Sequence, residues 1–156
     1  MRLYVDTSAL VKLWIDEDGA EAVRIAFEDA VEVASSLIAL AEQRATLGRL
    51  LREGRVSRQQ LPIVEAQSAS HIEMMTFISP DEQLVRDAGE LAFRYGLKTL
   101  DAIHLASAVV LRLVEPDHEW VFLTFDLRLA RAASAEGFRV WPSAPTPPLI
   151  PGLRPS

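Results

Sequence analysis

The chain has 156 residues, of which 49% are hydrophobic and 24% charged, values typical of a single globular domain rather than a disordered or fibrous chain. It contains no cysteine, which excludes a disulfide framework, a zinc-thiolate site and a thiol nucleophile. The net charge of −6 is a poor electrostatic basis for broad nucleic-acid affinity, which usually depends on a basic surface.

The first residues do not resemble a secretory signal, because Asp6 interrupts their apolar run. No uncharged run approaches the roughly 18 residues needed to span a membrane. We therefore expect a cytoplasmic protein that does not associate with membranes.

Short apolar runs alternate with longer segments of helical periodicity. The expected strands cover residues 3–5, 31–34, 75–78, 121–125 and 138–141. The expected helices cover residues 8–15, 20–29, 35–54, 57–73, 82–96, 99–114 and 127–135. This alternation predicts an α/β domain built around a mostly parallel sheet.

Two of these helices follow each other without an intervening strand, which predicts a projecting helical pair. The first begins near Ser35 or Ser36, and the second begins with a capping-box pattern of Ser57 and Gln60. Pro62 predicts a kink or a late start in the second helix. We expect the domain to cover residues 1–141 and to be followed by a proline-rich, irregular tail over residues 142–156.

Four carboxylates occur where a charge is difficult to explain as a surface feature. Asp6 and Asp126 each follow an expected strand, Glu42 interrupts an apolar helical pattern, and Asp101 lies near the start of an apolar helix that we expect Thr99 to cap. Charged side chains are rarely buried unless they are paired or bind a metal. In parallel sheets, strand ends and helix starts meet at one edge, where ligands bind.

If these four groups converge, a cation or bound protons must compensate their charge. Two carboxylates about 4 Å apart repel by about 4 kcal/mol at an effective dielectric constant of about 20. A site rich in oxygen ligands and free of thiols suits Mg²⁺, with Mn²⁺ as an alternative. Simpler interpretations remain open: Asp101 can stabilise the first turn of its helix, and Glu42 can pair with Arg44 or Arg49 on the surface.

The sequence resembles that of PIN-domain proteins, most closely the VapC-type toxins of toxin–antitoxin pairs. The matching pieces are Tyr4–Lys12, Glu42, Leu97–Ala106, Phe122–Asp126 and Gly137–Val140, in order and at family-like spacing. The resemblance implies a three-layer α/β/α fold and a Mg²⁺-dependent endoribonuclease. It also implies an RNA substrate, a homodimer and a cognate antitoxin that the helical pair would bind.

The same resemblance assigns the acidic tetrad, which would hold the metal and catalyse hydrolysis, to Asp6, Glu42, Asp101 and Asp126. It places Ser8 and Thr124 at small polar positions that support the tetrad. The sequence departs from the family pattern at Leu129, where many PIN domains have a further acid, and this departure weakens the prediction of a second metal ion.

Two other functions remain open. A phosphatase with Asp6 as nucleophile would need a nearby lysine, and only Lys12 and Lys98 exist. A non-catalytic module of the same fold could bind RNA or a protein. His104 can be either a ligand or a buried, hydrogen-bonded histidine. The arginines at positions 44, 49, 52, 55 and 58 can be either phosphate contacts or a solvated helix face.

Overall fold

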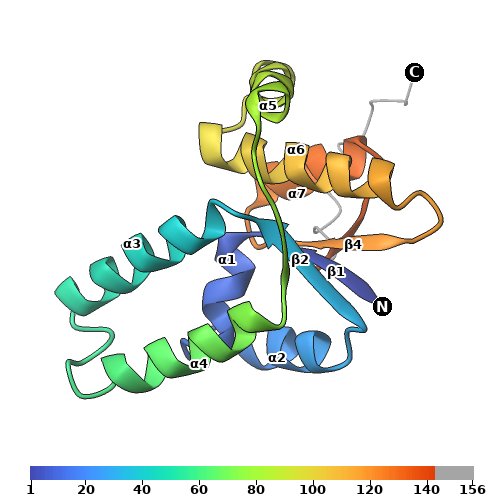
Figure 1. Cartoon of the computed structure of the whole chain (residues 1–156). Helices are drawn as coiled ribbons and strands as arrows, with labels where there is room; N and C mark the ends of the chain where they lie inside the picture. The colour runs from blue at the N-terminus through green and yellow to red at the C-terminus, as the bar shows by residue number, and fades with distance from the viewer. Residues whose placement is uncertain (143–156) are drawn as a thin grey trace, which may run out of the picture.

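The computed structural model describes residues 1–142, and a five-stranded sheet forms its centre (Figure 1). The strands lie in the order β3-β2-β1-β4-β5, and every neighbouring pair is parallel. They are β1 (Arg2–Val5), β2 (Glu32–Ser36), β3 (Thr76–Ile78), β4 (Trp120–Leu123) and β5 (Arg139–Trp141). This confirms the predicted α/β fold with a parallel sheet.

Helices cover both faces of the sheet and create two hydrophobic cores. Leu3 and Val5 point to the core formed with α1 to α4, whereas Tyr4 and Phe122 point to the core formed with α5 to α7, as the alternation along a strand requires (Figure 1). The helices are α1 (Thr7–Leu10), the 3-10 helix η1 (Val11–Leu13), α2 (Ala20–Glu28), α3 (Ala39–Arg52), α4 (Leu61–Glu73), α5 (Glu82–Tyr95), α6 (Thr99–Val114) and α7 (Leu127–Ala135). The molecule therefore has three layers.

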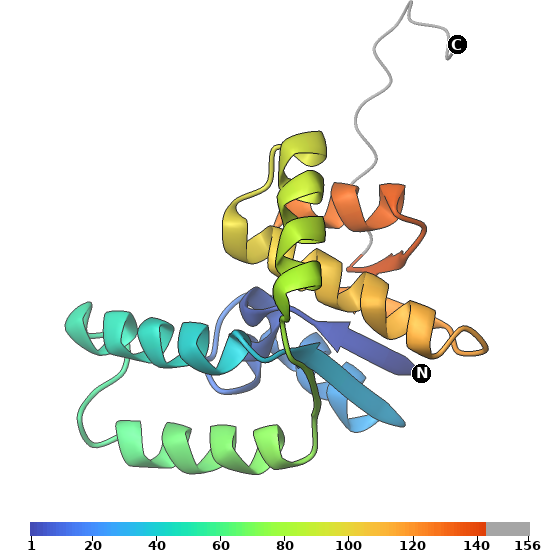
Figure 2. The same ribbon diagram turned by 45° about the horizontal axis from the view of Figure 1, so that its top comes forward.

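The predicted helical pair is α3 and α4, which extend side by side away from the sheet (Figures 1 and 2). Between them, Gln43 Nε2 donates to Ser68 Oγ at 3.2 Å in a buried position, and Arg44 forms an ion pair with Glu65. Ser57 and Gln60 make the two reciprocal bonds of a capping box at the turn before α4.

The predicted start of α3 and the predicted N-cap of α6 are wrong. Ser35 and Ser36 belong to β2, because Ser35 Oγ donates to the carbonyl of Val5 at 2.7 Å and so satisfies its hydroxyl within the sheet. The helix α3 begins only at Ala39. Thr99 is the first residue of α6 rather than its cap, and Lys98 holds the N-cap position without a side-chain bond.

The sheet order creates a crevice where the site is expected. β1 has β2 on one side and β4 on the other. The strand order therefore runs outward from β1 in two directions, to β2 and β3 on one side and to β4 and β5 on the other. In parallel α/β sheets, ligands bind beyond the carboxyl ends of strands at such a reversal. Asp6 directly follows β1, and Asp126 follows the adjacent β4 after two residues.

No helix within residues 1–142 is long and apolar enough to cross a membrane. The last strand ends at Trp141. Apart from Pro142, the proline-rich tail lies outside the described residues.

Candidate active site

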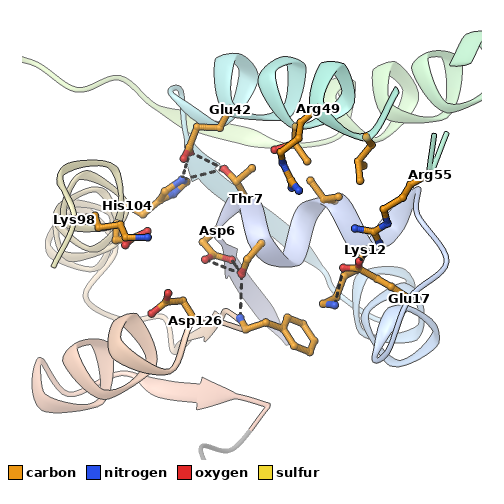
Figure 3. Close-up of a pocket in the computed structure, with 16 residues that line it drawn as sticks. Asp6, Thr7, Lys12, Glu17, Glu42, Arg49, Arg55, Lys98, His104 and Asp126 are labelled. Atoms are coloured by element: carbon orange, nitrogen blue, oxygen red, sulfur yellow. Dashed lines mark hydrogen bonds and ion pairs between the residues drawn. The ribbon is translucent and has the colours of Figure 1, made fainter. Parts of the chain in front are cut away.

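A polar cavity of about 580 Å³ opens beyond the carboxyl ends of β1 and β4 (Figure 3). All four predicted acids line it, although they come from distant segments of the chain. Asp6 caps α1, Glu42 and Asp101 lie in the first turns of α3 and α6, and Asp126 caps α7. The fold therefore brings the predicted tetrad together around one space.

The carboxylate of Asp6 is buried and tightly held. Its Oδ1 accepts hydrogen bonds from the Ala9 backbone at 3.0 Å and from Ser8 Oγ at 2.8 Å. Its Oδ2 accepts from Thr124 Oγ1 at 2.7 Å. Burial raises the pKa of Asp6, and nearby His104 together with these hydrogen bonds only partly opposes that rise.

A single threonine hydroxyl connects Asp6 to Asp126. Thr124 Oγ1 donates to Asp6 and accepts a hydrogen bond from the Asp126 backbone N–H at 3.1 Å. Asp126 Oδ1 caps α7 by accepting from the backbone N–H groups of Arg128 and Leu129 at 2.8 and 2.9 Å. No hydrogen bond from the described residues engages Asp126 Oδ2, so this oxygen is available to a ligand.

Asp101 is the least constrained of the four acids. Its side chain is half-buried and receives no hydrogen bond from another side chain in the described part of the chain. Burial raises the pKa of Asp101, and the charges of Asp126 and Asp6 raise it further, while Lys98 and His104 oppose the increase. The cavity thus contains negative charge that the protein itself does not balance.

Glu42 is held by two donors rather than by an arginine. Thr7 Oγ1 donates to Glu42 Oε2 at 2.6 Å, and His104 Nε2 lies 2.8 Å from the same oxygen (Figure 3). Burial would raise the pKa of Glu42, but the bonds from His104 and Thr7 outweigh it and lower the pKa. The proposed surface pairs do not form, because Arg44 pairs with Glu65 and Arg49 with Glu53.

His104 is a buried, satisfied histidine. Its side chain is 2% exposed, and its Nδ1 lies 3.2 Å from the hydroxyl of Tyr4. Since its other ring nitrogen contacts Glu42, neither nitrogen is free to bind a ligand. This favours the second of the two interpretations left open by the sequence.

The opposite wall of the cavity is basic, which the sequence indicated only through its arginine cluster. Lys12, Arg49 and Arg55 line this wall, whereas Lys98, at the N-cap of α6, lines the cavity on the side of His104 (Figure 3). Glu17 accepts from Lys12 Nζ at 2.8 Å and from Arg55 Nη2 at 3.0 Å, and so fixes two of these cations (Figure 3). Lys12 Nζ also lies 4.4 Å from the centre of the Phe125 ring. The site can therefore contact anionic groups on one side and a cation on the other.

The donor set suits a hydrated divalent cation. Among residues 1–142, no three histidine, aspartate or glutamate side chains are close enough to form a ready-made metal site. The free oxygens of Asp101, Asp126 and Glu42 nevertheless face a shared cavity with excess negative charge. Mg²⁺ binds proteins through few carboxylates and retains several waters, so it does not require a closed cage.

Leu129, which stands where many PIN domains have a further acid, is part of the core. Leu129 is fully buried in the cluster beneath α6 and α7, so a carboxylate there would lose its hydration without a partner. Five described acids therefore line this cavity: the four of the tetrad, and Glu17, which pairs with Lys12 and Arg55.

The comparisons with known proteins agree with this architecture. The sequence pattern of the PIN domain family matches residues 3–135. Two curated relatives from Mycobacterium tuberculosis are each 30% identical over 141 residues, covering 90% of this chain and 95% of the relative. They are Ribonuclease VapC45, from strain CDC 1551 / Oshkosh, and Ribonuclease VapC49, from strain ATCC 25618 / H37Rv.

Two solved structures share the fold. VapBC2 from Rickettsia felis, bound to a DNA fragment from its promoter, has a TM-score of 0.59 at 14% identity, covering 90% of this chain and 97% of the other. PAE2754 from Pyrobaculum aerophilum has a TM-score of 0.60 at 16% identity, covering 90% and 83%. Because the family pattern spans nearly the whole described chain and the relatives cover it almost end to end, the chain belongs to the PIN domain family.

Proposed function

We propose that this protein is a metal-dependent endoribonuclease and the toxin of a toxin–antitoxin pair. The observation that carries the proposal is that Asp6, Glu42, Asp101 and Asp126 surround one cavity whose opposite wall is basic. The curated relatives, which are named ribonucleases, support RNA as the substrate.

In this proposal the four acids hold Mg²⁺, or alternatively Mn²⁺. The bound cation would supply an activated water and stabilise charge on the phosphoryl oxygens. Asp6 and Asp126 contribute rigidity, since each is fixed as a helix cap. Arg49, Arg55 and Lys98 bind phosphates of the RNA strand and orient it across the acids.

We also propose an antitoxin partner and a homodimer. The structural neighbour from Rickettsia felis is described as VapBC2, and its likeness to this chain supports a similar pairing. The projecting helix α3, which pairs with α4, forms one wall of the cavity through Glu42, Thr46 and Arg49. A protein bound to this pair would therefore lie beside the site and block it.

The test is cleavage of a mixed RNA pool by purified protein free of any partner, in Mg²⁺, Mn²⁺ or EDTA. Asp6→Asn and Asp101→Asn serve as comparison variants, with circular dichroism to confirm that they fold. We expect cleavage that requires the metal and is lost in both variants. Intact RNA with folded protein that still binds Mn²⁺ would favour the non-catalytic binding module. Cleavage that persists in both variants would contradict the assigned site.

A further inference from the structure

We propose that Thr7, His104 and Tyr4 form a positioning relay that directs one oxygen of Glu42 toward the metal. The proposal rests on the metal-dependent function above and adds residues outside the acidic tetrad. None of the three would touch the metal or the RNA, so they are positioning residues rather than catalytic ones.

The relay is a continuous chain of hydrogen bonds between four elements. It runs from Tyr4 OH in β1 to His104 Nδ1 in α6 at 3.2 Å, and from His104 Nε2 to Glu42 Oε2 in α3 at 2.8 Å. Thr7 Oγ1, in α1, lies 2.6 Å from the same Glu42 oxygen and 3.3 Å from His104 Nε2. Tyr4 and His104 are both buried, so the inner part of the relay is shielded from water.

The chemistry of Glu42 fixes the direction of the two bonds that it receives. An ionised carboxylate only accepts hydrogen bonds, so His104 Nε2–H and the Thr7 hydroxyl must both donate to Glu42. The other ring nitrogen, Nδ1, faces Tyr4 OH at 3.2 Å, and the relay as proposed has Tyr4 OH as the donor of this bond. Both donors use Oε2, and no described side chain bonds to Oε1. The relay thus occupies one oxygen and leaves the other for the cavity.

Glu42 needs this support more than its neighbours do. Asp6 and Asp126 accept bonds from the backbone of their own helices, which fixes them locally. Glu42 has no such cap, carries a longer side chain and lies on a helix that projects from the sheet. Its described hydrogen bonds all come from Thr7 and His104, 35 and 62 residues away in sequence. Groups that orient metal ligands typically change metal affinity about 10- to 100-fold when removed.

The experiment compares Mn²⁺ affinity, measured by calorimetry, among three threonine variants of the full chain. Thr7→Val keeps the shape and removes the hydroxyl, and Thr7→Ser restores the donor. Thr46→Val removes a hydroxyl that lines the same cavity and makes none of the described hydrogen bonds to Glu42. We expect Thr7→Val to weaken Mn²⁺ binding by about 10-fold, the lower end of that range. We expect Thr7→Ser and Thr46→Val to bind nearly as tightly as the unchanged protein.

Two further measurements identify the cause. In a Glu42→Gln background, Thr7→Val should produce no additional loss, because the two changes act on the same contact. The ¹⁵N shifts of the His104 ring should show a proton on Nε2 and none on Nδ1, which tests the relay without any metal.

The outcomes separate this proposal from the proposed function. Normal Mn²⁺ binding that Thr7→Val leaves unchanged, or a proton on Nδ1 of His104, would overturn the relay alone. An unchanged protein that binds no Mn²⁺ and cleaves no RNA would overturn the proposed function, and with it the metal-directing role of Glu42.

Discussion

At the scale of single residues, the acids around the cavity fall into two electrostatic groups. Burial raises the pKa of Asp6, and burial together with the charges of Asp126 and Asp6 raises the pKa of Asp101. In contrast, donors from His104 and Thr7 lower the pKa of Glu42 despite its burial. The protein stabilises the charge of Glu42 but leaves that of Asp101 unfavourable. A bound cation would remove this penalty, so occupancy of the site and stability of the fold should be linked.

We expect Asp101→Asn to raise the melting temperature of the metal-free protein at neutral pH. A carboxyl whose pKa is raised by folding favours the fold below its ordinary value of 3.8 and opposes it once the pH exceeds the raised value. The amide removes that opposition. Thermal unfolding in EDTA at neutral and acidic pH measures the effect, with Asp117→Asn as an exposed control.

The same variant should lose the stabilisation that Mg²⁺ gives the unchanged protein. A lower melting temperature for Asp101→Asn in EDTA at neutral pH would contradict the electrostatic account. Equal stabilisation of both proteins by Mg²⁺ would show that Asp101 does not contribute to metal binding.

At the scale of elements, the end of α4 is attached to the body of the molecule by an aromatic cluster. Trp14 Nε1 donates to His71 Nδ1 at 2.9 Å, and the Phe27 ring packs edge-on against His71 with centroids 5.1 Å apart. Burial lowers the pKa of His71, with Glu28 opposing. The neutral ring is thus the form that holds α4 in place.

We expect acidification to loosen this attachment. A histidine whose pKa is lowered by folding contributes stability above its ordinary value of 6.5, and that stability is lost as the pH falls through the lowered value. The melting temperature should therefore depend less on pH between about 7.5 and 5 in His71→Gln than in the unchanged protein. His118→Gln, at an exposed histidine, is the control. Identical pH profiles for His71→Gln and the unchanged protein would exclude a role of neutral His71 in attaching α4.

Over the whole molecule, charge is distributed unevenly. The net charge is −6, yet four basic side chains line the cavity. Most of the acidic excess therefore lies elsewhere on the protein or in the tetrad, and RNA affinity should depend on a few local contacts rather than on the overall field.

We expect Arg55→Ala and Arg49→Ala to weaken RNA binding and to make the remaining affinity less dependent on salt. Each lost contact with a single-stranded phosphate should reduce the slope of log affinity against log salt by about 0.7. Fluorescence anisotropy of labelled RNA across a salt series measures this slope. Arg58→Ala removes an exposed arginine from the same sequence cluster but outside the cavity wall, and should leave the slope unchanged.

The sequence predicted the parts of the molecule that depend on local pattern. The apolar runs just before Asp6 and Asp126 identified β1 and β4, because buried parallel strands are almost continuously hydrophobic. The prediction that a helix starts at Ser35 or Ser36 is wrong because both residues belong to β2. The Ser35 hydroxyl is satisfied inside the sheet, which local polarity does not reveal.

The contacts that shape the site were not predictable in this way. Glu42 and His104 are 62 residues apart, and only the packing of α3 and α6 against opposite sides of β1 and β2 brings them together. Likewise, Glu17 could not be distinguished from a solvated loop acid, although it holds Lys12 and Arg55 at the cavity.

The strand order determines which acids would be separated if the chain were cut. A break in the turn between α3 and α4 would leave β1 and β2, with Asp6 and Glu42, on one piece, and β3, β4 and β5, with Asp101 and Asp126, on the other. The second piece supplies both outer neighbours of the β1–β2 pair, so it would enclose the first from either side. Each fragment alone would carry half of the acids and no cavity, and we expect reassembly of the two to restore the site, as in a split reporter enzyme.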